Sequence, residues 1–201
     1  SENTIGNIDK ASDENDIGIW LATGTINATV SGNTVATLGY TGTGSFAPIG
    51  INVTSGVTAT NNNVTGNTVS DISTNGTGTV RGISVSGTAA DLTIQKNNVQ
   101  GILNANTGTW GAYGIDVTAG NNIVVKNNFV SNVTHDMTGG GAFSTTFGVF
   151  GIRVGSGTGH KIYDNSVNLY GLMPGAPATS LLSAAFALVG TTSTDCDVRD
   201  N

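Results

Sequence analysis

A few charged side chains recur at matching distances along the chain, and they are the residues most able to do chemistry. Asp116 is followed 37 residues later by Arg153, and Lys126 and Asp164 form a second such pair that Lys96 extends. A lyase could use a carboxylate to hold calcium and a nearby basic residue to abstract a proton. Opposite charges at matching positions can also compensate one another at the surface, where an exposed pair contributes about 0–1 kcal/mol. We prefer the second interpretation and assign no catalytic residue.

The densest acidic cluster lies in "DKASDENDIG" at 9–18, with Asp9, Asp13, Glu14 and Asp16 in one predicted loop. Calcium prefers several carboxylate oxygens, but the spacing and the glycine of an EF-hand loop are missing. We expect a solvated acidic loop, with a calcium site as the alternative. The sequence indicates no other cofactor.

The bulk composition argues against several classes of partner. The chain has 201 residues with seven Lys and Arg against thirteen Asp and Glu, a net charge of −6. Binding to nucleic acid needs clustered basic residues, so we expect none. No apolar run is long enough to span a membrane. Cys196 is the only cysteine, and a weakly charged chain rich in Thr, Asn and Gly suits an exported bacterial protein at the cell surface or outside the cell.

The elements that position these residues are set by a repeat. "GIWL", "GINV", "GISV", "GIDV" and "GIRV" begin at Gly18, Gly50, Gly82, Gly114 and Gly151, so successive copies are 32, 32, 32 and 37 residues apart. Each copy holds three short stretches of alternating apolar residues, bounded by Gly, Asn or Thr. Strands this short cannot form a sheet within one copy, so each must pair with its counterpart in the next. We therefore expect almost no helix and a solenoid of parallel sheets, with the Ile and Val of each motif pointing inward.

A recurring asparagine changes its spacing along the chain together with the Gly-Ile-x-Val motif. An asparagine follows an apolar stretch in every copy, at Asn3, Asn33, Asn67, Asn97, Asn127, Asn165 and Asn201. Equivalent residues of successive coils lie about 4.8 Å apart, and an amide both donates and accepts hydrogen bonds. We predict that these asparagines form a hydrogen-bonded ladder at a buried turn.

The chain resembles the right-handed parallel β-helix proteins, whose founding members include pectate lyases. The resemblance rests on the turn "GNTV" at 32–35 and 66–69, "KNNV" at 96–99, "KNNF" at 126–129 and "DNSV" at 164–167. It implies an all-β, right-handed parallel β-helix of about six coils, formed by residues 1–201 as a single segment. "GIRVGSGTGHKIYDNSVNLYG" is similar to repeats of large exported bacterial surface proteins, which implies a stalk, adhesin or filament.

Activity does not follow from this architecture. Galacturonan hydrolases of this fold use several Asp side chains with His and Arg-x-Lys groups, and no "NTD", "DD", "GHG" or "RIK" stands at corresponding positions here. His160 occupies the position of Leu92, Ile123 and Cys196 in other copies, so we interpret it as a residue at the edge of the core. We expect a structural or adhesive segment that is not an enzyme, with a polysaccharide-binding or polysaccharide-degrading β-helix as the alternative.

The segments before each Gly-Ile motif differ in length and fall at the same predicted turn, on one side of the rod. Aromatic residues gather in or beside them, at Tyr40, Trp110, Tyr113, Phe143, Phe147, Phe150 and Tyr170. They could stack on sugar rings, with Tyr40, Trp110, Tyr113, Phe147 and Tyr170 as glycan contacts, or pack these segments against the rod, which we prefer.

Both termini fall at the same position of the repeat, and neither has a sequence typical of a capping coil. We expect as partners further β-helix coils, in the same polypeptide or as copies stacked end to end into a filament.

Overall fold

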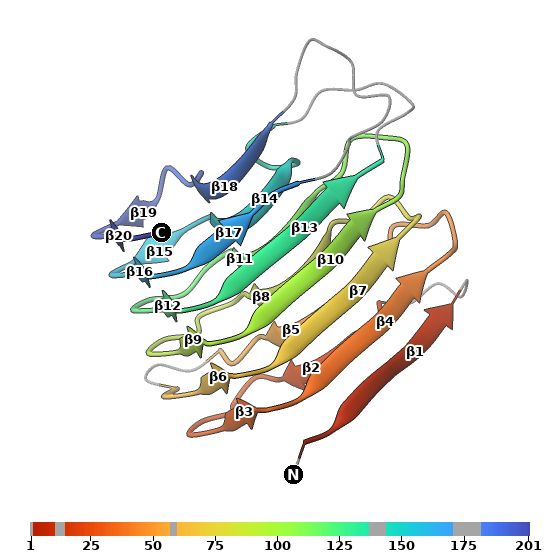
Figure 1. Cartoon of the computed structure of the whole chain (residues 1–201). Coiled ribbons are helices and arrows are strands. Elements are labelled where there is room, and N and C mark those ends of the chain that lie inside the picture. Colours follow the sequence, from red (N-terminus) through yellow and green to blue (C-terminus); the bar gives the residue numbers. More distant parts are fainter. Residues whose placement is uncertain (1, 11–14, 57–59, 137–143, 171–181) are drawn as a thin grey trace.

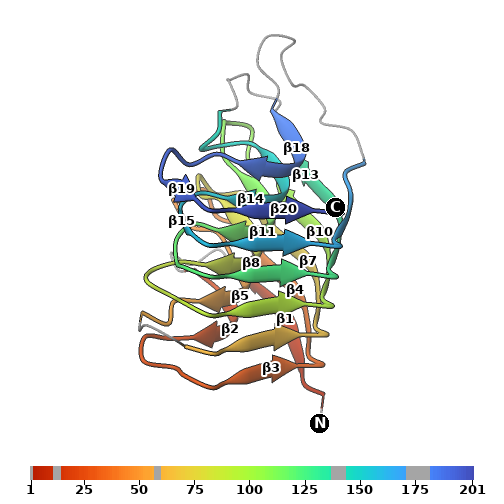
Figure 2. The ribbon, with the colours of Figure 1, turned by 90° about the vertical axis from the view of Figure 1, so that its left-hand side faces the viewer.

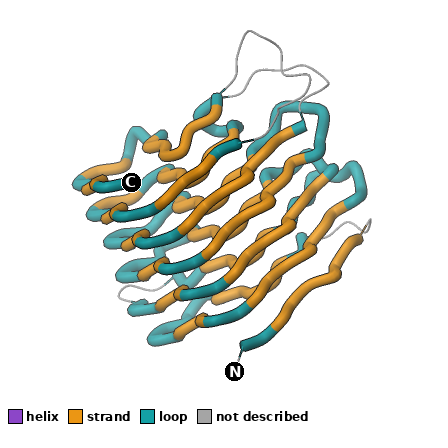
Figure 3. Tube along the Cα trace, in the orientation of Figure 1, coloured by secondary structure: helices purple, strands orange, loops and turns teal. Residues whose placement is uncertain are grey.

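A computed structural model of the chain describes residues 2–10, 15–56, 60–136, 144–170 and 182–201. These residues form strands and connecting turns without any helix (Figure 3). Three parallel sheets of six strands carry the fold. Sheet A comprises β1 (Thr4–Lys10), β4 (Thr34–Tyr40), β7 (Thr68–Thr74), β10 (Asn98–Asn104), β13 (Phe129–His135) and β17 (Ser166–Asn168). Sheet B comprises β2 (Ile17–Leu21), β5 (Ile49–Val53), β8 (Val80–Val85), β11 (Ala112–Val117), β14 (Val149–Val154) and β18 (Ser183–Leu188).

Sheet C is narrower, and a small fourth sheet lies beside it. Sheet C comprises β3 (Thr29–Ser31), β6 (Asn63–Thr65), β9 (Thr93–Gln95), β12 (Val124–Lys126), β16 (Lys161–Tyr163) and β20 (Asp197–Arg199). The fourth sheet pairs β15 (Gly157–Thr158) with β19 (Ser193–Thr194).

The chain passes from sheet A to sheet B to sheet C and then enters the next coil, winding right-handed about the rod axis (Figures 1 and 2). Each strand pairs in parallel with its counterpart one coil on, as Ile83 does with Ile115 and Ile115 with Ile152. The six strands of each sheet are thus separated by five stacking steps. This confirms the predicted right-handed parallel β-helix.

The core lies between the three sheets and is made by the residues that the repeat marked as inward. Ile and Val of the Gly-Ile-x-Val motif are fully buried in the central coils, at Ile51, Val53, Ile83, Val85, Ile115 and Val117. The glycine that begins the motif is required because no room is left for a side chain at its position. A Cβ on Gly114 would lie 2.4 Å from Cγ1 of Val130 and 2.6 Å from the carbonyl oxygen of Gly151. Gly18, Gly50, Gly82 and Gly151 meet the same kind of obstruction, which explains why the motif begins with glycine.

Residues with a positive φ mark the corners of the coil. One series lies in the middle of sheet A strands, at Asn7, Thr37, Asp71, Gly101 and Asn132, and bends each strand. A second precedes sheet C, at Asn27, Asn61, Asp91, Asn122, Gly159 and Asp195. Asn, Asp and Gly tolerate this left-handed conformation best, so these series account for much of the Asn and Gly in the composition.

The described segments of variable length, 41–48, 75–79 and 105–111, all join sheet A to sheet B on the same side of the rod (Figure 1). The prediction that they share one side is confirmed for these three segments. Segments 41–48 and 75–79 line a hollow together with residues of β2, β5 and β8 in sheet B.

Candidate functional site

The predicted asparagine ladder stands at the turn between sheet C and sheet A. Nδ2 of each asparagine donates to Oδ1 of the next over six steps of 2.8–3.0 Å, through Asn3, Asn33, Asn67, Asn97, Asn128, Asn165 and Asn201. The same Oδ1 accepts the backbone N–H of the preceding ladder residue, as Asn128 does from Asn97 at 3.0 Å. The second N–H of Asn128 donates to the carbonyl of Ile94 at 3.0 Å. The oxygen and the nitrogen of every ladder amide in the central coils are therefore hydrogen-bonded.

One ladder residue was predicted wrongly. Asn128, which is 2% exposed, occupies the ladder, whereas Asn127 is exposed and has a φ of 53°. Asn127 fills the corner position just before the ladder, which is held elsewhere by Gly32, Gly66, Lys96, Asp164 and Asp200. The signal that could have separated the two was the glycine in "GNTV", which shows that the residue before the ladder is the one with the left-handed backbone.

The charged pair of Asp116 and Arg153 belongs to a buried cluster on the outer face of sheet B. Asp116 and Arg153 are register partners, as predicted, with Nη1 of Arg153 3.0 Å from Oδ1 of Asp116. Arg81 contributes its Nε at 2.7 Å from Oδ2. The pair was expected to be exposed, but the Asp116 side chain is completely buried. Two guanidinium groups and one carboxylate give the cluster a net charge of +1 in a chain of net charge −6.

Tyr113 lies between the two arginines of this cluster. Its ring centroid is 5.6 Å from Cζ of Arg81 and 5.2 Å from Cζ of Arg153. Its hydroxyl donates to the carbonyl of Thr146, in the segment that leads to β14. Burial raises the pKa of Tyr113 to about 12, so the phenol remains a proton donor at neutral pH. The cluster thus fastens a segment between sheets A and B to the rod.

The second charged row differs from the prediction. Lys126 pairs with Gln95 and Tyr163 on sheet C, whereas Asp164 shares the corner position before the ladder with Lys96 and Asn127. Lys126 and Asp164 are therefore one position apart in the repeat. They form no ion pair in the structure, and the proposed calcium and base pair does not assemble there.

The aromatic residues predicted near the variable turns are mostly covered by protein, although they lie outside the core between the sheets. Tyr40 and Tyr113 are each 2% exposed. Tyr40 contacts Phe46 edge-on at 5.7 Å, and Tyr113 contacts Phe150 at 5.4 Å between ring centroids. Their ring faces are covered by protein, so neither can stack on a sugar in this structure.

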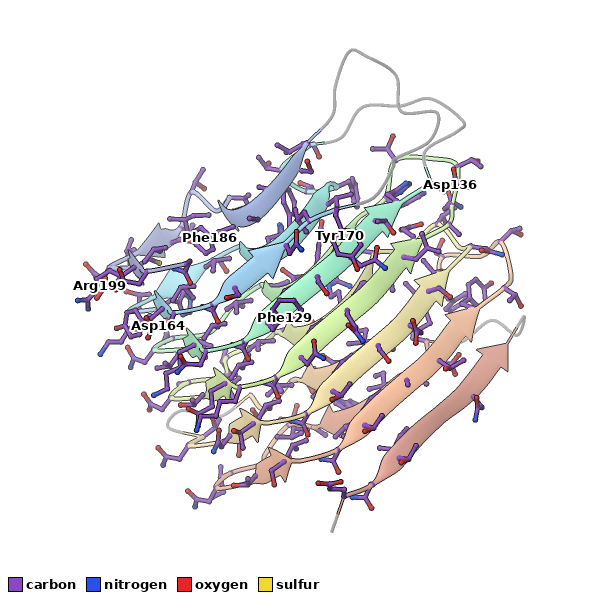
Figure 4. All side chains as sticks on the ribbon, viewed as in Figure 1. Phe129, Asp136, Asp164, Tyr170, Phe186 and Arg199 are labelled. Atoms are coloured by element: carbon purple, nitrogen blue, oxygen red, sulfur yellow. The ribbon has the colours of Figure 1, made fainter. Side chains whose placement is uncertain are left out.

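Trp110 and Phe147 are half-buried and contact each other edge-on at 5.1 Å. Tyr170 is 55% exposed and lies with Phe129 on the sheet A side of the rod (Figure 4). Tyr170 thus keeps an exposed ring, and Phe129 is a second exposed ring that was not among the predicted glycan contacts. Phe143 lies outside the described residues.

His160 lies in the position predicted for it, beside Ile123 on one coil and Cys196 on the next. Its Nδ1 accepts the backbone N–H of Ile123 at 3.3 Å, so its Nε2 carries the proton and donates to the carbonyl of Ser156 at 3.0 Å. Burial lowers the pKa of His160, which favours this neutral form. His160 completes a turn at the edge of the core.

The acidic cluster proposed for calcium is only partly described. Asp13 and Glu14 lie outside the described residues, and Asp9 lies in β1. Asp16 is 7% exposed, and its carbonyl accepts the backbone N–H of Ile49 at 2.9 Å. Within the described ranges, no three His, Cys, Asp or Glu side chains come close enough together to hold a metal ion.

Comparison with protein-family models, curated proteins and solved structures gave no match. Within the part of the chain that the structure describes, no helix is long and apolar enough to cross a membrane.

Proposed function

We propose that this chain is a structural and adhesive β-helical segment of an exported bacterial protein, located at the cell surface or in an extracellular filament. The continuous asparagine ladder carries the proposal. It joins every coil to the next by side-chain bonds of 2.8–3.0 Å, in addition to the backbone pairing of three sheets. Bonds along the axis in every coil make a stiff rod, and low charge with one cysteine suits a chain that works outside the cell.

Pulling a single molecule along the rod axis tests this function. A structural rod should resist force and then yield coil by coil, and removing one ladder amide in Asn128→Ala should lower the force at which the first coils yield. Asn127→Gly is the matched control, because Gly32 and Gly66 already occupy that position. Unfolding at negligible force, or equal forces for both variants, would contradict a mechanical role.

Further β-helix coils or copies of the chain stacked end to end are the partners we propose for the edge formed by β1, β2 and β3. Each of these strands pairs on one side only among the described residues. A hollow of about 570 Å³ at this edge is lined by Asn3, Ile5, Gly18, Ile19, Trp20, Thr29, Val30, Ser31 and Asn33. Strand edges beside an open apolar core favour pairing with another strand. Sedimentation of the chain should show concentration-dependent assembly that Val30→Lys reduces; a monomer at all concentrations would argue against stacked copies.

A polysaccharide-degrading β-helix is the second candidate, and the buried Asp116 between two arginines is the observation that favours it. Incubation with a panel of acidic and neutral polysaccharides tests it. Turnover that is lost in Asp116→Asn or Lys126→Ala, in variants that stay folded, would replace the structural proposal with an enzymatic one.

A further inference from the structure

A groove of about 300 Å³ runs over the outer face of sheet B across three successive coils. It is lined by Asn15, Ile17, Ser45, Ala47, Ile49, Asn52, Gly78, Thr79 and Arg81. Ile17, Ile49 and Arg81 occupy equivalent positions on β2, β5 and β8. The groove therefore combines an apolar strip with hydroxyl and amide groups and ends at one cation, a composition typical of small-ligand sites.

Two polar side chains on this face have no hydrogen-bond partner among the described residues. Asn52 is 8% exposed and Ser84, its register partner, is 4% exposed, yet neither side chain forms a hydrogen bond with any described residue. Solvent reaches the polar atoms of both side chains, so water can bond to them when no ligand is bound. The Asn52 amide, which lines the groove, is thus available to a ligand that supplies a hydroxyl or carboxylate.

Trp20 stands beside Asn52 as its register partner on β2. Its ring is 60% exposed, the largest exposure among the described large apolar side chains. Nε1 of Trp20 donates to Oγ1 of Thr54 at 2.7 Å, which fixes the orientation of the ring. An exposed indole held in place is a flat surface on which the C–H face of a sugar ring can stack.

Arg81 lies at the other end of the groove. Some of its N–H donors have no hydrogen-bond partner among the described residues. A guanidinium has five N–H groups. Nε donates to Asp116 at 2.7 Å and one N–H of Nη1 donates to the carbonyl of Thr79 at 3.0 Å, so three of the five remain without a partner among the described residues. Since Arg153 also neutralises Asp116, the cluster keeps one positive charge beside the groove. Arginine donors of this kind bind carboxylates well.

We propose that this groove binds a carboxylate-bearing saccharide, with one sugar ring stacked on Trp20, its hydroxyl groups bonded to Asn52 and a carboxylate at Arg81. The three features lie on one face of neighbouring coils, so an extended saccharide parallel to the rod axis reaches all of them. This inference rests on the adhesive part of the proposed function and names its ligand. Trp20, Asn52 and Arg81 recognise the ligand without chemical conversion.

Calorimetric titration of the purified chain tests the site with two probes. One is a tetrasaccharide of 1,4-linked mannuronic acid, and the other is the same tetrasaccharide with its carboxyl groups reduced to alcohols. We expect the acidic form to bind about tenfold more tightly than the reduced form. Trp20→Ala should weaken its binding by about tenfold or more. Asn52→Ser should also weaken binding, and it should fold because Ser84 occupies the same position one coil on.

Phe129→Ala is the matched control, because Phe129 has an exposed ring on the sheet A side of the rod and is not among the candidate glycan contacts. It should leave binding unchanged. Equal affinity for the two tetrasaccharides, no binding of either, or equal effects of Trp20→Ala and Phe129→Ala would overturn the proposal. The pulling measurement distinguishes this failure from failure of the structural function: a stiff rod that binds neither tetrasaccharide refutes the site alone.

Discussion

Nδ2 of Asn128 donates a hydrogen bond of 2.9 Å to Oδ1 of Asn165, a residue 37 positions later in the chain. The two residues are distant in sequence and equivalent in the repeat, so this one contact shows how the solenoid is held. The same amide also donates to the carbonyl of Ile94 and accepts from Asn97. A single side chain thereby joins three successive coils.

Replacing this residue should therefore be costly. Asn128→Ala removes several buried hydrogen bonds and leaves partners on Asn97 and Asn165 unsatisfied, so we expect the free energy of unfolding to fall by about 3 kcal/mol or more. Urea unfolding followed by circular dichroism measures the loss. Asn127→Gly, at the neighbouring exposed corner, should change stability by about 0.5 kcal/mol at most. Equal losses in the two variants would show that Asn127 shares the ladder role.

The buried carboxylate of Asp116 should matter in a different way. Asp116→Asn leaves two guanidinium groups without their counter-charge in a covered site, and we expect a loss of about 3 kcal/mol in the free energy of unfolding. Asp71→Asn is the control, because Asp71 is exposed and Asn132 occupies the equivalent position two coils on. A loss below about 1 kcal/mol for Asp116→Asn would mean that solvent reaches the cluster.

The glycine of the Gly-Ile-x-Val motif should not tolerate a methyl group. Gly114→Ala places a Cβ 2.4 Å from the side chain of Val130 and 2.6 Å from the carbonyl of Gly151, so strands β11 and β14 must move apart. We expect a loss of about 3 kcal/mol, measured by thermal or urea unfolding. Gly66→Asn is the control, because a Cβ there meets no atom within 4 Å and Asn127 already holds that corner. A stable Gly114→Ala variant would contradict the close packing of the motif.

Stability should fall in mild acid through His135. This side chain is 1% exposed, and burial lowers its pKa to about 4 from the usual value of 6.5. Between these two values the unfolded chain binds the proton and the folded chain does not, so the stability present above pH 6.5 is lost as the pH falls toward 4. Between pH 7 and pH 5 the expected loss is about 2 kcal/mol.

His135→Asn should flatten this dependence. Asn104 occupies the equivalent position one coil earlier, so the variant keeps a side chain that the coil accepts. His160, whose pKa is also lowered by burial, should leave a smaller dependence of the same sign. An unchanged pH profile in His135→Asn would assign the acid sensitivity to other groups.

Much of the fold could be predicted because a solenoid repeats the same local requirements in every coil. The inward Ile and Val, the obligatory glycine and the ladder amides recur at matching intervals, so the spacing alone identified the coil, its core and the common side of the variable turns. Each coil contacts chiefly its neighbours, so no distant pairing had to be guessed.

Residue type alone could not separate adjacent residues of the same kind. Asn127 and Asn128 have the same chemistry; the glycine in "GNTV" was an indirect signal, and the pairing of β12 with β9 and β16 shows directly that Asn128 meets Asn97 and Asn165. The same holds for Lys126, which lies one position away from the row in which it was predicted.

The sequence by itself determined the repeat, and with it the β-helix and the residues that form its interior, because burial and backbone pairing impose one pattern on every coil. Only the tertiary structure decided what lies over the outer face of sheet B. Arg81 stands at a different position of the repeat from Asp116, and it reaches the carboxylate because its long side chain extends from β8 to β11. Trp20 and Asn52 likewise share a position in the repeat, yet Trp20 is 60% exposed and Asn52 only 8%, because β5 has a neighbouring strand on both sides and β2 has one on a single side among the described residues.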